Sequence, residues 1–124
     1  LLSSFGKAIY LENEALIDVV TAISGSGPAY IFYLIEVLSK IGKNQGLDEK
    51  DAKSLAVETL VGSAKLLEKS NLDPEGLRHN VTSPGGTTEA GLEVLASEQD
   101  GLYSLLKSTV QSAKKRAEDL NSSD

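Results

Sequence analysis

Residues 27 to 38 read GPAYIFYLIEVL, and this stretch decides what kind of fold the chain can adopt. Pro28 suits the first turn of a helix because its missing N–H would have no partner there, and Ser26 and Gly27 are N-cap candidates. From Ala29 to Leu38 the side chains are almost entirely apolar, on every side of the predicted helix. A helix that is apolar all round must be buried all round, so it requires a central place in a bundle or a partner subunit.

Helical periodicity continues on both sides of this stretch. Gly46 is expected to end the apolar helix, and Asp48 and Asp73 are expected to cap the two helices that follow. The small residues Ala56 and Gly62 would let another helix approach closely. The predicted helices run over residues 14–23, 28–45, 49–69, 74–81, 88–97 and 102–120. The sequence therefore predicts an all-α fold, a bundle of about six helices.

Composition and charge limit the possible partners. The net charge of −6 argues against nucleic acid, and the basic run at residues 114–116 lies among acids, as on a solvated helix face. With no cysteine and His79 as the one histidine, a metal site is not expected, and His79 is predicted to be a surface residue. No apolar run is long enough for a membrane span and no signal peptide is recognisable, so a cytoplasmic protein is predicted.

The first residues, LLSSFGKAIYLENE, lack a starting methionine and open on an apolar pair. Gly6 to Leu11 could form one short strand, which cannot make a sheet alone. We therefore expect the chain to be the C-terminal part of a larger protein. Residues 1–13 would be the end of a linker or strand from a missing domain, residues 14–120 a helical domain, and residues 121–124 a polar tail.

Two glycine-bearing segments are candidate binding sites. The segment from Gly25 to Tyr30 lacks the third glycine and the preceding strand of a dinucleotide fingerprint, so it is better explained as a helix start that lines a cleft. The loop TSPGGTTEAG, residues 82–91, places Pro84 and two glycines before a helix whose first N–H groups have no intrahelical partner. It is either a capped corner or an anion site. Without a lysine, an anion site would suit a carboxylate rather than a triphosphate.

The motif AISGSGPAY, Ala22 to Tyr30, followed some fifty residues later by VTSPGGTT, Val81 to Thr88, resembles the C-terminal domain of pyrroline-5-carboxylate reductase. The resemblance extends from about Gly6 to Leu120. It implies an interleaved two-fold dimer of helical domains, similar to the C-terminal domain of 6-phosphogluconate dehydrogenase. It also implies an enzyme that reduces 1-pyrroline-5-carboxylate to L-proline with NADPH or NADH, the cofactor being bound mainly by an N-terminal Rossmann domain.

The resemblance also assigns residues to roles. The backbone N–H groups of Gly85, Gly86 and Thr87 would bind the substrate carboxylate, Thr88 would hydrogen-bond the ring nitrogen as the catalytic residue, and Ser83 would help to hold the loop. The residues bordering the nicotinamide side of the cleft would be Ser24, Gly25, Ser26 and Gly27.

One departure from the family pattern is Asp100-Gly101-Leu102, where Gly-Gly-Phe is usual; it affects packing rather than loop chemistry. The alternative to the enzyme is a non-catalytic helical dimerisation or assembly module, in which the 82–91 loop is only a corner. Without a nucleotide-binding domain, the 124 residues alone are expected to be inactive.

Overall fold

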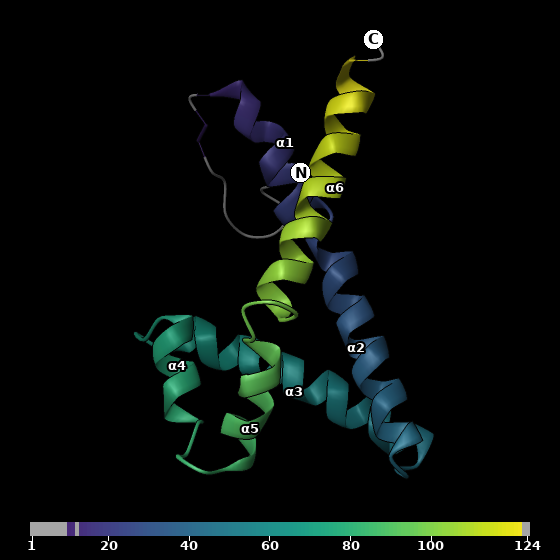
Figure 1. Cartoon of the computed structure of the whole chain (residues 1–124), viewed down its shortest axis with the longest axis vertical. Coiled ribbons are helices and arrows are strands. Elements are labelled where there is room, and N and C mark those ends of the chain that lie inside the picture. Colours follow the sequence, from purple (N-terminus) through teal and green to yellow (C-terminus); the bar gives the residue numbers. More distant parts are fainter. Residues whose placement is uncertain (1–9, 12, 123–124) are drawn as a thin grey trace. The chain divides into compact units, whose positions relative to one another are not determined.

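The computed structural model describes Tyr10, Leu11 and residues 13–122, apart from the side chain of Glu14. Within these residues every regular element is a helix (Figure 1). The elements are the 3₁₀ turn η2 (Glu14–Leu16), α1 (Ile17–Val20), the π-helix η3 (Thr21–Gly25), α2 (Gly27–Asn44), α3 (Glu49–Lys69), α4 (Pro74–Asn80), α5 (Thr87–Leu95) and α6 (Leu102–Ser122). The all-α prediction is confirmed. The strand expected near Gly6 falls largely outside the described residues.

Local signals in the sequence set most helix ends. The Asp48 carboxylate accepts a hydrogen bond from the Lys50 N–H at 3.1 Å, and Asp73 accepts one from the Gly76 N–H at 2.9 Å, so both predicted N-caps are confirmed. Gly46 has a φ of +110°, which favours glycine. The Leu47 N–H donates to the Gly42 carbonyl at 3.1 Å, which completes the Schellman end of α2.

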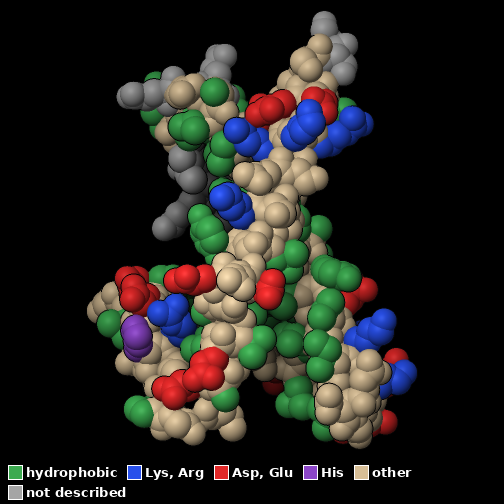
Figure 2. Space-filling view, viewed as in Figure 1, with side chains coloured by type: hydrophobic (Ala, Val, Ile, Leu, Met, Phe, Trp, Pro, Cys, Tyr) green, Lys and Arg blue, Asp and Glu red, His purple; other side chains and the backbone are tan. Residues whose placement is uncertain are grey.

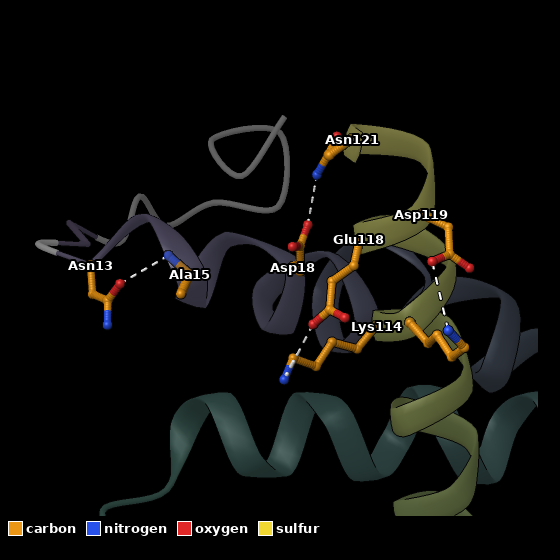
Figure 3. Close-up of polar contacts among 8 residues, drawn as sticks. Asn13, Ala15, Asp18, Lys114, Glu118, Asp119 and Asn121 are labelled. Carbon is orange, nitrogen blue, oxygen red and sulfur yellow. Dashed lines mark hydrogen bonds and ion pairs between the residues drawn. The ribbon is translucent and has the colours of Figure 1, made fainter. Parts of the chain in front are cut away.

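The chain divides into two compact units. One comprises the described residues up to Tyr30 together with those from Leu95 onward, and the other is Ile31–Val94. In the first unit, α6 lies beside α1 and contacts η3 (Figure 1). Ala22 in η3 is fully buried, and the Asn121 amide donates to the Asp18 carboxylate at 2.8 Å (Figure 3). This unit therefore joins residues about a hundred positions apart in the chain.

The basic run on α6 is a paired and exposed surface. Lys114 lies 3.5 Å from the Glu118 carboxylate, one helical turn away (Figure 3). Lys115 lies 3.7 Å from the Asp119 carboxylate, also one turn away. Lysine, arginine and acidic side chains gather over this part of α6 in Figure 2. The prediction of a solvated helix face is confirmed.

Gly101, in the turn before α6, is buried and its N–H donates to the Ser97 carbonyl at 3.0 Å. A Cβ at this position would collide with the Ser97 carbonyl and lie 2.7 Å from the Leu95 carbonyl oxygen. Both neighbours are backbone atoms, so neither can rotate away. The glycine of the Asp100-Gly101-Leu102 corner is therefore required by packing.

We expect Gly101→Ala to lower the free energy of unfolding by about 1–3 kcal/mol, the usual cost of forcing an extra methyl group into a packed site. Gly91→Ala is the control, because a Cβ on Gly91 meets nothing within 4 Å and alanine stabilises a helix interior by about 0.5–1 kcal/mol. Urea denaturation at one fixed protein concentration measures both. Equal effects of the two substitutions would contradict the packing role of Gly101.

The second unit, Ile31–Val94, holds α2 and α3 close together at their junction. A Cβ on Gly42 would lie 3.1 Å from the Ala52 Cβ, so the absence of a side chain allows this approach. Ala52 and Ala56 are buried on the α3 side. His79 on α4 is exposed, as predicted, and lies 3.7 Å from the Glu75 carboxylate.

Within the described chain the apolar helix α2 is not buried. Several of the large side chains between Ala29 and Leu38 expose 41% to 65% of their surfaces, and hydrophobic side chains gather over α2 in Figure 2. These residues are Ile31, Phe32, Tyr33, Leu34 and Leu38. Of the two environments that the sequence allowed, a central place in a bundle is not formed among the described residues. In the described part of the chain, no helix is both long and apolar enough to cross a membrane.

Candidate functional site

The loop between α4 and α5 is a tight turn built around two glycines (Figure 1). The Gly86 N–H donates to the Ser83 carbonyl at 3.0 Å, which closes a four-residue turn. Pro84 supplies the fixed φ that suits the second position, and Gly85 has a φ of +73° at the third. This combination is that of a type II turn, which favours glycine at its third position. The sequence therefore determines the shape of the loop.

The helix α5 begins at Thr87, directly after the turn. A Cβ on Gly86 would lie 3.2 Å from the Ser83 carbonyl oxygen, so this second glycine allows a close backbone approach. The Gly86 carbonyl accepts from the Ala90 N–H at 3.2 Å, which makes Gly86 the N-cap residue of α5. Thr87 and Thr88 then occupy the first two helical positions and are exposed.

The start of α5 carries donors that are open to a ligand. In the described part of the chain, the backbone N–H groups of Thr87, Thr88 and Glu89 have no hydrogen-bond acceptor. The hydroxyls of Thr87, Thr88 and Ser83 have no partner among the same residues. Unpaired N–H groups and the positive end of the helix dipole both favour an anion at this point.

Two of the three N–H groups assigned to a substrate carboxylate are already engaged within the chain. The Gly86 N–H closes the turn, and the Gly85 N–H donates to Oε1 of Glu89 at 3.1 Å. Sequence reasoning did not single out Glu89, although it stands three residues after the N-cap, where capping-box acids occur. That spacing was the signal that could have found it.

The second candidate segment, Ser24 to Gly27, begins within the π-helix η3 and ends at the first residue of α2. The Ser26 N–H donates to the Thr21 carbonyl at 2.9 Å, five residues back. The hydroxyls of Thr21 and Ser24 bond the carbonyls four residues before them, both at 3.0 Å. Such π-turns are often found at functional sites.

Ser26 does not cap α2 as expected. It has helical backbone angles, and its hydroxyl has no partner in the described part of the chain. Instead, the Tyr30 hydroxyl donates to the Ala22 carbonyl at 3.0 Å, which ties the start of α2 to the π-turn. Ser24 to Gly27 belong to the first unit, and residues 82–89 belong to the second.

The fold and the turn define the class: an all-helical domain with a donor-bearing turn and exposed apolar side chains on α2. The chain belongs to the pyrroline-5-carboxylate reductase dimerisation family, whose model matches residues 14–120.

Relatives and solved structures agree with this assignment. The chain is 40% identical over 120 residues to a pyrroline-5-carboxylate reductase of Pseudomonas aeruginosa, covering 97% of this chain and 43% of the relative. With the Arabidopsis thaliana enzyme of the same name it shares 42% identity over 123 residues, 99% of this chain and 44% of the relative. The chain thus spans less than half the length of these relatives.

Two solved structures match the helices. A pyrroline-5-carboxylate reductase of Coxiella burnetii aligns with a TM-score of 0.82 and 38% identity, over 90% of this chain and 41% of that one. The Plasmodium falciparum pyrroline carboxylate reductase, solved with NADP bound, aligns with a TM-score of 0.77 and 34% identity, over 87% and 40%.

Proposed function

We propose that the chain is the dimerisation and substrate-binding part of an enzyme that reduces 1-pyrroline-5-carboxylate to L-proline with NADPH or NADH, the last step of proline biosynthesis. The observation that carries the proposal is the start of α5, where unpaired N–H groups stand beside the Thr88 hydroxyl. A carboxylate needs such donors, and a ring nitrogen that gains a proton needs a group that can both accept and donate. The names of the relatives supply the substrate class.

The proposed roles come from the resemblance to the family, and the loop geometry supports them. Thr88 is the catalytic residue that hydrogen-bonds the ring nitrogen. The turn formed by Ser83, Gly85 and Gly86 would hold the Thr87 N–H and its neighbours toward a bound carboxylate. With the Gly86 N–H held by the turn, the main donors are those of Thr87, Thr88 and Glu89, and Gly85 becomes available when Glu89 releases it.

The residues Ser24 to Gly27 are suited to contact only one part of a nicotinamide cofactor. Ser24 to Gly27 offer small side chains and hydroxyls, and a Cβ on Gly27 would meet nothing within 4 Å. They include no cationic group, so they suit the edge of a nicotinamide ring and not a pyrophosphate. When bound, the cofactor would supply the hydride. We propose that it is held mainly by a Rossmann domain outside these 124 residues, that the 124 residues alone are inactive, and that the enzyme is cytoplasmic.

The proposed partner of the chain is a second copy of itself in an interleaved two-fold dimer. Support comes from the exposed apolar side chains of α2 and from the family description. Small-residue positions on α3 offer room for a partner helix, because a Cβ on Gly62 would meet nothing within 4 Å among the described residues.

We expect L-proline, added to the isotopically labelled 124-residue chain, to shift the amide resonances of Thr87, Thr88 and Glu89 before any others. Affinity should be weak, because the cofactor face of the pocket is not part of this chain. Two-dimensional NMR titration measures this, with cyclopentane carboxylate as a second ligand and pyrrolidine, which lacks the carboxylate, as the control. Uniform or absent shifts at high concentration would favour the alternative, a non-catalytic dimerisation or assembly module in which the loop is a corner.

A further inference from the structure

Glu89 places the chain's own carboxylate on the loop that is proposed to bind a carboxylate. Its Oε1 accepts the Gly85 N–H at 3.1 Å, and the side chain is half-buried. Glu89 lies in the first turn of α5, where the helix dipole favours a negative group. The Glu89 carboxylate therefore already provides, in part, the negative charge that the start of α5 favours.

This contact differs from an ordinary capping box. In a capping box, the acid at the third helical position accepts the N–H of the N-cap residue itself. Here the N-cap is Gly86, whose N–H is held by the Ser83 carbonyl, and Glu89 reaches one residue further back to Gly85. Gly85 has a φ of +73°, so the acid bonds the residue whose conformation defines the turn.

A ligand carboxylate at the start of α5 would meet Glu89 in two ways. The two groups would compete for the Gly85 N–H, because that N–H can serve only one strong acceptor at a time. They would also repel each other, since both are anionic and would lie at the same helix end. Neither effect operates on a ligand that lacks a carboxylate.

We propose that Glu89 is an internal occupant of the carboxylate loop, which holds the Gly85 turn in the empty protein and is displaced when a ligand carboxylate binds. This role rests on the proposed function of the loop. It makes Glu89 a residue that tunes affinity: the acid stabilises the ligand-free loop and weakens the binding of every carboxylate that must replace it.

The test uses two substitutions at Glu89 and one matched control in the 124-residue chain. Glu89→Gln keeps the length and an oxygen acceptor but removes the charge, and Glu89→Ala removes the occupant altogether. Glu93→Gln makes the same charge change one turn further along α5, outside the first turn. The first measurement is hydrogen exchange of the Gly85 amide without ligand, which should be fastest in Glu89→Ala and unchanged in Glu93→Gln.

The second measurement is the dissociation constant of L-proline by NMR titration. We expect Glu89→Gln and Glu89→Ala to bind about three- to tenfold more tightly than the unmodified chain, where tenfold corresponds to about 1.4 kcal/mol. Glu93→Gln should not differ from the unmodified chain. Tightening in the alanine variant matters most, because alanine cannot supply a new donor to the ligand.

The possible results separate the two proposals. If the unmodified chain binds proline and both Glu89 variants bind equally or more weakly, Glu89 only supports the loop, and the internal-occupant role is overturned while the proposed function stands. If no form of the chain binds proline, the proposed function of the loop fails, and the inference fails with it.

Discussion

At micromolar concentration the 124-residue chain is expected to sediment as a dimer or a larger assembly, and Phe32→Asp is expected to dissociate it. Phe32 lies on α2 and exposes 65% of its surface in the single chain, beside other exposed apolar residues. If a second copy covers this face, an aspartate there would be an unpaired buried charge, which costs about 3–5 kcal/mol. A loss of that size at one copy weakens association by roughly a hundred- to several-thousandfold, and a two-fold dimer carries the change on both copies.

Sedimentation velocity over a concentration series measures the effect. Gln111→Asp is the control, because it adds the same charge at an exposed position of α6. A folded, stable monomer of the unmodified chain at micromolar concentration would contradict the proposed dimer. Equal assembly of the two aspartate variants would show that α2 does not form the interface.

The second large effect is expected for Thr88→Val in an enzyme that carries both this domain and a nucleotide-binding domain. Valine keeps the β-branched shape but removes the hydroxyl proposed to contact the ring nitrogen. Losing one well-placed hydrogen bond in a closed site costs about 1–3 kcal/mol, so kcat/KM should fall by roughly ten- to a hundredfold. Steady-state kinetics at saturating cofactor measures the loss.

Stability should hardly change in the same variant. The N-cap of α5 is Gly86, and the Thr88 hydroxyl has no partner in the described part of the chain, so its removal should cost less than about 0.5 kcal/mol. Ser83→Ala is the comparison: the turn uses the Ser83 carbonyl, which alanine retains, so activity should fall less than in Thr88→Val. Full activity with a much lower melting temperature in Thr88→Val would make Thr88 a structural residue.

Local chemistry made the helices predictable. The caps Asp48 and Asp73 bond N–H groups only two and three residues away, and the C-terminal signal of Gly46 acts over five residues. Such contacts depend on the neighbouring sequence and on little else, so α3 was predicted with the bounds Glu49–Lys69 that the structure has. The tight turn at Pro84 and Gly85 was predictable for the same reason.

The sequence by itself thus determined the all-α class, most helix ends, the glycine turn and the need of α2 for an environment that buries it. Only the tertiary structure decided that Thr21–Gly25 forms a π-helix, which packs against α6, an element near the other end of the sequence. The tertiary structure likewise decided that Gly101 is buried. It also decided which loop donors are engaged and which are open to a ligand. The physical reason is that periodicity and caps act within a few residues. Which backbone N–H groups find an acceptor depends instead on how the folded chain brings donors and acceptors together.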